Sequence, residues 1–175
     1  MTISKIKILH DMLKSGEISC VELTQKYIDS IKAENDKLNA YVFTTEDLAL
    51  EQAKAVDEKI KNGEEIGLLE GIPMTLKDNI STNGIETTCC SKILTGYKPI
   101  YDAFVWNELK KQGAILLGKT NMDEFAMGST CETSYYGGAS NPHNLNHVPG
   151  GSSGGGASAV SGNIAVYALG SDTGG

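Results

Sequence analysis

The spacing of apolar residues predicts three helices in the first third of the chain. Ser19 and Glu22 match a capping box, and apolar residues then recur at four-residue spacing, which predicts an amphipathic helix over about residues 20–34. A second apolar stripe predicts a helix over about 45–62, and a shorter helix is expected to end near Gly16. Because the other faces of these helices are charged, we expect them to cover a core and to carry no chemistry.

In the rest of the chain, short apolar runs alternate with helical patterns. Buried strands are predicted over 72–76, 114–117 and 164–169. Asp102 is the predicted cap of a helix that ends at Gly113, and a further helix is predicted over roughly 154–161. This alternation favours an α/β fold, in which N-terminal helices are followed by the start of a mainly parallel sheet with packed helices.

The length of 175 residues suits one domain. We expect it to have a helical N-terminal part over 1–66 and an α/β part over 67–175. The last 48 residues contain 12 of the 20 glycines, and the sequence stops in a glycine-rich turn directly after a predicted strand. Because α/β proteins place reactive groups in such turns, we expect the domain to be incomplete.

The charge balance narrows the class of protein. The chain has 22 acidic residues against 15 basic ones, all lysine, and a formal net charge of −7. Without guanidinium groups, such a chain is a poor candidate for a free-standing DNA or RNA binder, although RNA contact through a partner stays open. Its apolar runs are far shorter than the ~20 residues that span a bilayer. The N-terminus also lacks the apolar segment of a secretory signal, so we expect a cytoplasmic protein.

Two segments suggest reactive side chains. Lys77 ends a predicted buried strand, and glycines surround Ser152 in VPGGSSGGG. Such glycines let a backbone approach a ligand closely, and successive N–H groups can hold an anion or an oxyanion. A single lysine at a strand end usually extends into solvent. Lys77 becomes a candidate reactive residue because the sequence also contains the glycine-rich segment around Ser152.

Several other site types fit the sequence poorly. A phosphate-binding P-loop needs a lysine directly after its last glycine, where this chain has Ala157. Residues 154–159 match G-x-G-x-x-A, but polar turn residues precede them where a dinucleotide site requires a buried strand. His143 and His147 have the spacing of some zinc ligands, but the four cysteines of the chain include no C-x-x-C pair to complete a site or a disulfide framework.

Acyl transfer is the chemistry that the composition allows. A serine hydroxyl needs a base to become a nucleophile, and a buried lysine can be that base in its neutral form, because burial disfavours its charge. No histidine occupies a plausible catalytic setting in this sequence. Serine with lysine is therefore the expected combination.

Four segments of the sequence resemble the amidase signature family. They are GIPMTLKDNI, GAILLGKTNMDEFAMGS, NPHNLNHVPGGSSGGGASAV and ALGSDTGG, and together they extend from about residue 71 to the last residue. The family uses a Ser, cis-Ser, Lys triad. The resemblance implies that Lys77 is the catalytic lysine and that Ser152 is the bridging serine, preceded by a cis peptide bond from Gly151.

The same resemblance implies an oxyanion hole and a nucleophile at the end of the chain. The backbone of Thr173, Gly174 and Gly175 matches the turn that holds the oxyanion in the family. The nucleophilic serine of the family directly follows this turn, one position past the last residue given. We therefore expect the given chain to be inactive alone.

Within the family, NMDEFAMGS and TTCCSKIL most resemble the tRNA-dependent amidotransferase branch. This implies glutamine as the substrate, hydrolysed through an acyl-enzyme, with the ammonia passed to a partner protein that amidates Glu-tRNA(Gln). It implies no cofactor in this chain, since ATP, magnesium and tRNA bind mainly to that partner, and a small third protein completes the assembly. A stand-alone amidase acting on a small amide is the alternative. A nucleotide-binding module and a non-catalytic interaction protein are the alternatives from other classes.

Overall fold

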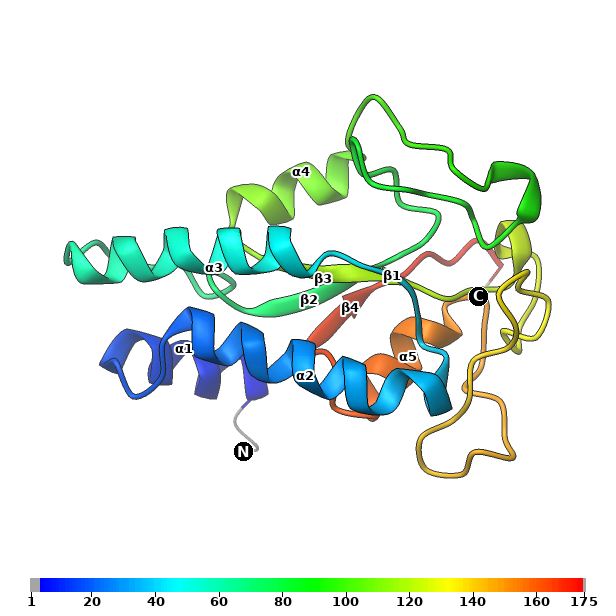
Figure 1. The fold of residues 1–175 in the computed structure, drawn as a ribbon, viewed down its shortest axis with the longest axis horizontal. Coiled ribbons are helices and arrows are strands. Elements are labelled where there is room, and N and C mark those ends of the chain that lie inside the picture. Colours follow the sequence, from blue (N-terminus) through cyan, green and yellow to red (C-terminus); the bar gives the residue numbers. More distant parts are fainter. Residues whose placement is uncertain (1–3, 175) are drawn as a thin grey trace.

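The sheet at the centre of the molecule carries helices on both faces (Figure 1). The structure is a computed structural model that describes residues 4–174. Its helices are α1 (Lys5–Ser15), α2 (Cys20–Leu38), α3 (Glu46–Lys61), α4 (Phe104–Lys111) and α5 (Gly154–Ser161), with short 3₁₀ helices η1 (Lys92–Leu94) and η2 (Glu124–Ala126). Its strands are β1 (Tyr41–Thr44), β2 (Pro73–Lys77), β3 (Ile115–Thr120) and β4 (Tyr167–Leu169). The α/β fold predicted from the sequence is confirmed.

The strands lie in the order β1-β3-β2-β4. β2 pairs in parallel with both β3 and β4, as the alternation of strands and helices predicts. β1 pairs antiparallel with β3 at the edge of the sheet. This strand was not predicted, because four residues between two helices are too few to show a pattern, and it lies in the 1–66 part that was expected to be helical. The sheet is therefore mainly parallel with one antiparallel edge strand.

The predicted helices form close to their expected positions. The capping box of Ser19 and Glu22 is present at the start of α2, which runs on to Leu38. α5 has the bounds expected from the sequence. Local signals were sufficient here, because a cap and an apolar stripe act within a few turns of one helix.

The prediction that Asp102 caps α4 is wrong. Ala103 occupies the N-cap position, and no side chain caps the helix there. The Asp102 carboxylate instead accepts the N–H of Asn83 at 2.7 Å and pairs with Lys110. A carboxylate directly before a helix can accept hydrogen bonds from several donors. Here it binds the N–H of Asn83 in a neighbouring loop and the ammonium of Lys110 on α4, so it does not bind the free N–H groups of the first turn of the helix.

An apolar core covers each face of the sheet. The larger core lies between the sheet and α1, α2, α3 and α5, and it includes Leu117 of β3. The smaller core packs Met74 and Leu76 of β2 against Trp106 of α4. In Figure 1, α4 accordingly lies on one side of the sheet, and α1, α2 and α5 lie on the other. Burial on both faces explains why Ile115, Leu116 and Leu117 of β3 are consecutive apolar residues.

Close backbone packing places the start of α5 at the carboxyl ends of the strands. The N–H of Gly155 donates to the Asn121 carbonyl oxygen at 3.0 Å. A Cβ on Gly155 would lie 2.5 Å from Ala40 O and from Asn121 N, so a larger residue does not fit. The serine-containing turn before α5 is therefore held directly against the residues that follow β3.

The structure also shows the state of the cysteines and whether any helix is long and apolar enough to cross a membrane. The four cysteines are free thiols. Burial raises the pKa of Cys20 and of Cys90 to about 12, so both thiols are protonated at neutral pH. Within residues 4–174, no helix combines the length and the apolar character needed to cross a bilayer.

Asp57 of α3 provides a second cap for α2, and this gives a prediction about stability. Its carboxylate accepts the N–H of Cys20 at 2.6 Å and that of Val21 at 3.0 Å. Asp57→Asn turns one acceptor into a donor that faces an N–H, so we expect the free energy of unfolding to fall by about 1–2 kcal/mol in urea denaturation. Glu51→Gln, at an exposed position of the same helix, should change it by less than about 0.5 kcal/mol. Equal losses in both variants would contradict the capping role.

Candidate active site

The side chain of Lys77 lies at the carboxyl end of β2 and is almost completely buried, with 1% of its surface exposed. Its Nζ donates hydrogen bonds to Ser152 Oγ at 2.6 Å and to Ser171 Oγ at 2.9 Å. A longer contact of 3.4 Å joins Nζ to the carbonyl oxygen of Ser171. The fold thus brings Lys77 and Ser152, which are 75 positions apart in the sequence, into direct contact.

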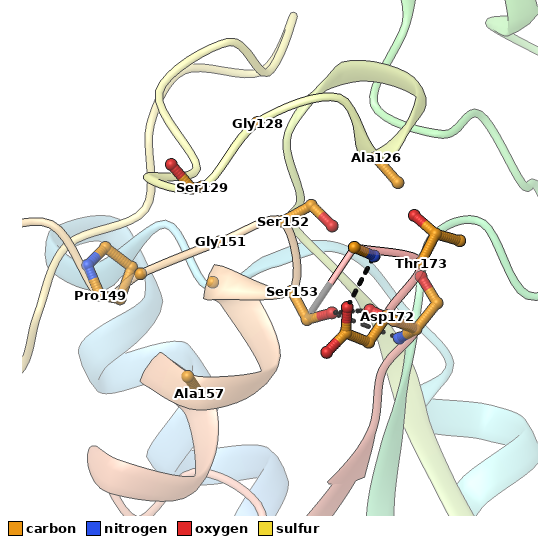
Figure 2. Close-up of a pocket in the computed structure, with 14 residues that line it drawn as sticks. Ala126, Gly128, Ser129, Pro149, Gly151, Ser152, Ser153, Ala157, Asp172 and Thr173 are labelled. Atoms are coloured by element: carbon orange, nitrogen blue, oxygen red, sulfur yellow. Dashed lines mark hydrogen bonds between the residues drawn. The ribbon is translucent and has the colours of Figure 1, made fainter.

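Ser152 sits in the turn that leads into α5. The Gly151–Ser152 peptide is cis, as the resemblance implies. The Ser152 carbonyl oxygen accepts the N–H of Asp123 at 3.1 Å. A Cβ on Gly151 would lie 2.3 Å from Asp123 Oδ2 and 2.6 Å from Thr130 N, so only glycine fits there. Figure 2 shows the Ser152 and Ser153 side chains pointing towards the turn that carries Asp172 and Thr173.

The surroundings of Lys77 favour its neutral form. Burial lowers the pKa of Lys77, because the ammonium loses its hydration, and the nearby Asp123, Cys131, Asp172 and Cys89 oppose this effect without cancelling it. Lys77 takes part in none of the ion pairs formed among residues 4–174. A buried amine that contacts hydroxyl groups and no carboxylate is suited to accept a proton from one of them.

A second fully buried lysine, Lys119 on β3, has a different environment. Its Nζ donates to Ile80 O and to Thr87 Oγ1, both at 2.8 Å, and lies 3.5 Å from Asp78 Oδ1. In the β2–β3 pairing Lys119 is not the partner of Lys77, and the two side chains point to opposite faces of the sheet. Lys119 therefore forms a buried ion pair that holds the loop after β2, whereas Lys77 faces the serines.

A cavity of about 510 Å³ lies beside Ser152. Its wall is formed by the turn before α5 and the start of that helix, by parts of the segment 126–129, and by residues 171–174, so it includes Thr173 and Gly174. The N–H of Gly174 donates to Asp172 Oδ1 at 3.2 Å in this structure. Gly175, the third residue expected at the oxyanion hole, lies outside the described residues. The structure therefore gathers Ser152, Thr173 and Gly174 around one cavity, with Lys77 in contact with Ser152.

Ser171 and Asn79 belong to the same hydrogen-bond network, although the sequence analysis did not select them. Ser171 Oγ accepts hydrogen bonds from Lys77 Nζ and from Asn79 Nδ2, at 2.9 Å each. Ser153 Oγ lies 3.2 Å from the Ser171 carbonyl oxygen and donates to it. A signal for them was present in the sequence, since residues just beyond parallel strands gather at the same edge of a sheet, and both positions follow predicted strands.

The structure shows the surroundings of the residues that suggested other site types. Among residues 4–174, no three His, Cys, Asp or Glu side chains are arranged to hold a metal ion. His143 Nε2 lies 2.7 Å from Ser161 Oγ on the surface, where the two groups can share a hydrogen bond. The glycine pattern over 154–159 opens α5, but a turn and not a strand precedes it. A dinucleotide fingerprint requires that strand.

Comparison with known proteins identifies the family. The Amidase family profile matches residues 22–175, and the chain therefore belongs to the amidase family. A curated relative, the A-subunit of the glutamyl-tRNA(Gln) amidotransferase of Thermoanaerobacter pseudethanolicus, is 53% identical over 167 residues, which cover 95% of this chain and 34% of that protein. This chain thus spans about a third of the length of the curated relatives that it matches.

Solved structures agree with this assignment. The peptide amidase of Stenotrophomonas maltophilia superposes with a TM-score of 0.84 at 35% identity, covering 91% of this chain and 34% of that one. The A-subunit of the glutamyl-tRNA(Gln) amidotransferase of Thermotoga maritima superposes with a TM-score of 0.71 at 36% identity, covering 86% of this chain and 32% of that one. The fold predicted from the family resemblance is therefore confirmed.

The two buried lysines should respond differently when their charge is removed. Lys119→Met leaves the Asp78 carboxylate buried without a cation, so we expect the free energy of unfolding to fall by about 3–5 kcal/mol. Lys77→Met leaves only hydroxyl groups without their donor, and we expect a loss of about 1 kcal/mol or less. Urea denaturation at neutral pH measures both. A loss for Lys77→Met as large as that for Lys119→Met would show that Lys77 is held by a carboxylate.

The lowered pKa of Lys77 also makes stability depend on pH. Between this pKa and the ordinary lysine value of 10.5, the unfolded chain binds the extra proton, so the free energy of unfolding rises with pH. Wild type should therefore gain stability relative to Lys77→Met as the pH rises through this range, and the difference should be constant below it. Urea denaturation of both proteins in steps of pH tests this expectation. If the stability of wild type relative to Lys77→Met does not change with pH in this range, or falls as the pH rises, the result would contradict a lowered pKa.

Proposed function

We propose that this chain carries the lysine base and the bridging serine of an amidase that works through a serine acyl-enzyme. The observation that carries the proposal is the 2.6 Å contact between the buried Nζ of Lys77 and Ser152 Oγ, beside the cavity. Membership of the amidase family supports it. A nucleotide-binding module or a simple interaction protein needs no buried amine that contacts two serine hydroxyls and has no carboxylate partner.

In the proposed reaction, the neutral amine of Lys77 takes the proton of Ser152, and Ser152 takes the proton of the nucleophilic serine that the resemblance places directly after Gly175. The nucleophile oxygen bonds to the amide carbon, and backbone N–H groups of the 173–175 turn stabilise the oxyanion. The relay then returns the proton to the leaving nitrogen as the C–N bond breaks, and ammonia departs. Water hydrolyses the remaining ester, and its proton restores the serine.

The narrower proposal is a glutamine-hydrolysing subunit that supplies ammonia for the amidation of Glu-tRNA(Gln) to Gln-tRNA(Gln). Its support is the 53% identity with an amidotransferase A-subunit over 95% of this chain. In this proposal the amidotransferase subunits B and C complete a heterotrimer in the cytoplasm. ATP, magnesium and tRNA bind mainly to the first of these two partners, and this chain is assigned no cofactor.

A stand-alone amidase acting on a small amide is the second candidate. The structure superposes better on the peptide amidase, at a TM-score of 0.84, than on the Thermotoga maritima A-subunit, at 0.71, although the identities are nearly equal. Lys77 and Ser152 have the same roles in both candidates. The substrate and the need for partner proteins are what separate them.

The proposed function predicts that the encoding DNA continues with a serine codon after Gly175, and that the given chain alone releases no ammonia from glutamine. In the longer polypeptide with its partners, Lys77→Ala and Ser152→Ala should each lower kcat by about 10³-fold or more, because each removes a member of one proton relay. Downstream sequencing and an ammonia-release assay measure these outcomes. Lys26→Ala, at an exposed position of α2, is the control and should leave kcat unchanged.

Three results would count against parts of this proposal. A stop codon directly after Gly175 would remove the nucleophile and with it the enzyme assignment for this product. Full activity in Lys77→Ala would remove the role of the lysine. Hydrolysis of small amides without partner proteins, in preference to glutamine, would favour the stand-alone amidase.

A further inference from the structure

Asp123 lies just beyond β3 and is fully buried, yet the proposed reaction does not use it. Its Oδ2 accepts the N–H of Cys131 at 2.9 Å, and its Oδ1 accepts the hydroxyl of Thr133 at 3.0 Å. A weaker contact of 3.4 Å joins Oδ1 to the Thr133 N–H. One carboxylate thus holds the loop over 128–133, which contributes Ser129 to the wall of the cavity.

The same residue also contacts the turn that carries Ser152. Its backbone N–H donates to the Ser152 carbonyl oxygen at 3.1 Å. A Cβ on Gly151 would lie 2.3 Å from Asp123 Oδ2, and a Cβ on Gly128 would lie 2.3 Å from Asp123 Cγ. Two glycines from separate segments of the cavity wall therefore pack against this one carboxylate. Asp123 joins the 128–133 loop to the Gly151–Ser152 turn.

The Asp123 carboxylate is ionised and has no cation in contact. Burial acts to raise its pKa, but the N–H groups of Cys131, Thr133 and Thr130 and the Thr133 hydroxyl outweigh burial and hold the pKa below its ordinary value. None of the ion pairs formed among residues 4–174 includes Asp123. The N–H and hydroxyl groups therefore stabilise the negative charge of Asp123, and this charge can attract a positive charge that forms nearby.

Lys77 is the neighbouring group that changes its charge in the proposed reaction. The charged or titratable groups that act on it are Asp123, Asp172 in the turn after β4, and the thiols of Cys131 and Cys89, and Asp123 acts most strongly among them to raise the pKa of Lys77. Asp123 is also linked to Lys77 through the Ser152 turn, since its N–H donates to the Ser152 carbonyl oxygen and the Ser152 hydroxyl contacts Lys77 Nζ. Asp78, the next residue in the chain, lies on the other face of the sheet and is paired with Lys119.

We propose that Asp123 is a positioning residue that joins the Ser152 turn to the 128–133 loop and whose buried carboxylate stabilises Lys77 while Lys77 carries a proton. The inference rests on the proposed function, because the ammonium forms only when the Lys77 amine accepts the proton of Ser152. Asp123 neither gains nor loses a proton in this step. Its fixed charge lowers the energy of the ammonium, and it acts on the reacting serine oxygen only through Lys77.

A purely structural role is the competing explanation, and Asp57 provides the matched control. Asp57 is also a carboxylate that accepts two backbone N–H groups, at the start of α2, and it is not among the groups that act on Lys77. If Asp123 only holds a loop, Asp123→Asn and Asp57→Asn should both lower the melting temperature and neither should affect Lys77. If Asp123 stabilises the ammonium, only Asp123→Asn should lower the pKa of Lys77 further.

The experiment is an NMR titration of the chain with ¹³C-labelled lysine and aspartate. The Lys77 Cε resonance, assigned by its loss in Lys77→Met, reports the pKa of Lys77 in wild type, Asp123→Asn and Asp57→Asn. The Asp123 Cγ resonance of wild type provides a second readout that needs no folded Asp123 variant. The chemical shift of this resonance should change with pH at the same midpoint as that of Lys77. The Asp123 resonance of Lys77→Met and the Asp57 resonance of wild type should not show this change.

The outcomes separate the inference from the proposed function. A Lys77 pKa at the ordinary value in wild type would contradict the proposed function itself. A lowered pKa that Asp123→Asn leaves unchanged, or an Asp123 Cγ resonance that does not change at the Lys77 midpoint, would overturn the role of Asp123 and leave the proposed function standing. A further downward shift in Asp123→Asn, together with the shared midpoint in wild type, supports the inference.

Discussion

The candidate site depends on a primary amine that is buried among hydroxyl groups, with no carboxylate in contact. Removing an ammonium from water is costly, so burial favours the neutral amine, and the oxygen atoms of Ser152 and Ser171 accept hydrogen bonds from its Nζ. Those two residues come from the turn before α5 and from the segment after β4. The amine therefore requires three separate parts of the chain to meet at the carboxyl end of β2.

Glycine positions make this meeting possible, because they let backbone segments approach more closely than side chains allow. At Gly151 and Gly155 an added Cβ would overlap residues that follow β3, so the turn between them lies directly on the end of the sheet. Asp123 occupies the centre of this contact and links the turn to the neighbouring loop. The glycine-rich composition near the end of the chain is thus explained by packing as well as by access to a ligand.

Much of the fold and part of the site were predictable from local sequence signals. The capping box at Ser19 and the apolar stripes determine the helices, and the alternation of strand and helix determines the parallel pairing. The family motifs point to Lys77 and Ser152, and the structure brings these two residues into contact. The role of Asp102 was predicted wrongly. Several donors lie near its carboxylate, and the tertiary arrangement of the surrounding loops determines which of them it binds.

By itself the sequence pointed, through the family motif, to Lys77 as the lysine beside the serines, but it did not determine on which face of the sheet the second buried lysine, Lys119, lies. That choice follows from a bulge: the β2–β3 pairing joins Met74 to Leu116 and Leu76 to Lys119, so β3 has one extra residue. The extra residue turns Lys119 away from the face that Lys77 occupies, because side chains alternate along a strand. The bulge includes Gly118, where a Cβ would lie 2.2 Å from Phe43 O of β1. The tertiary pairing of β3 with β2, and with β1, a strand too short to be recognised in the sequence, therefore decided the face on which Lys119 lies.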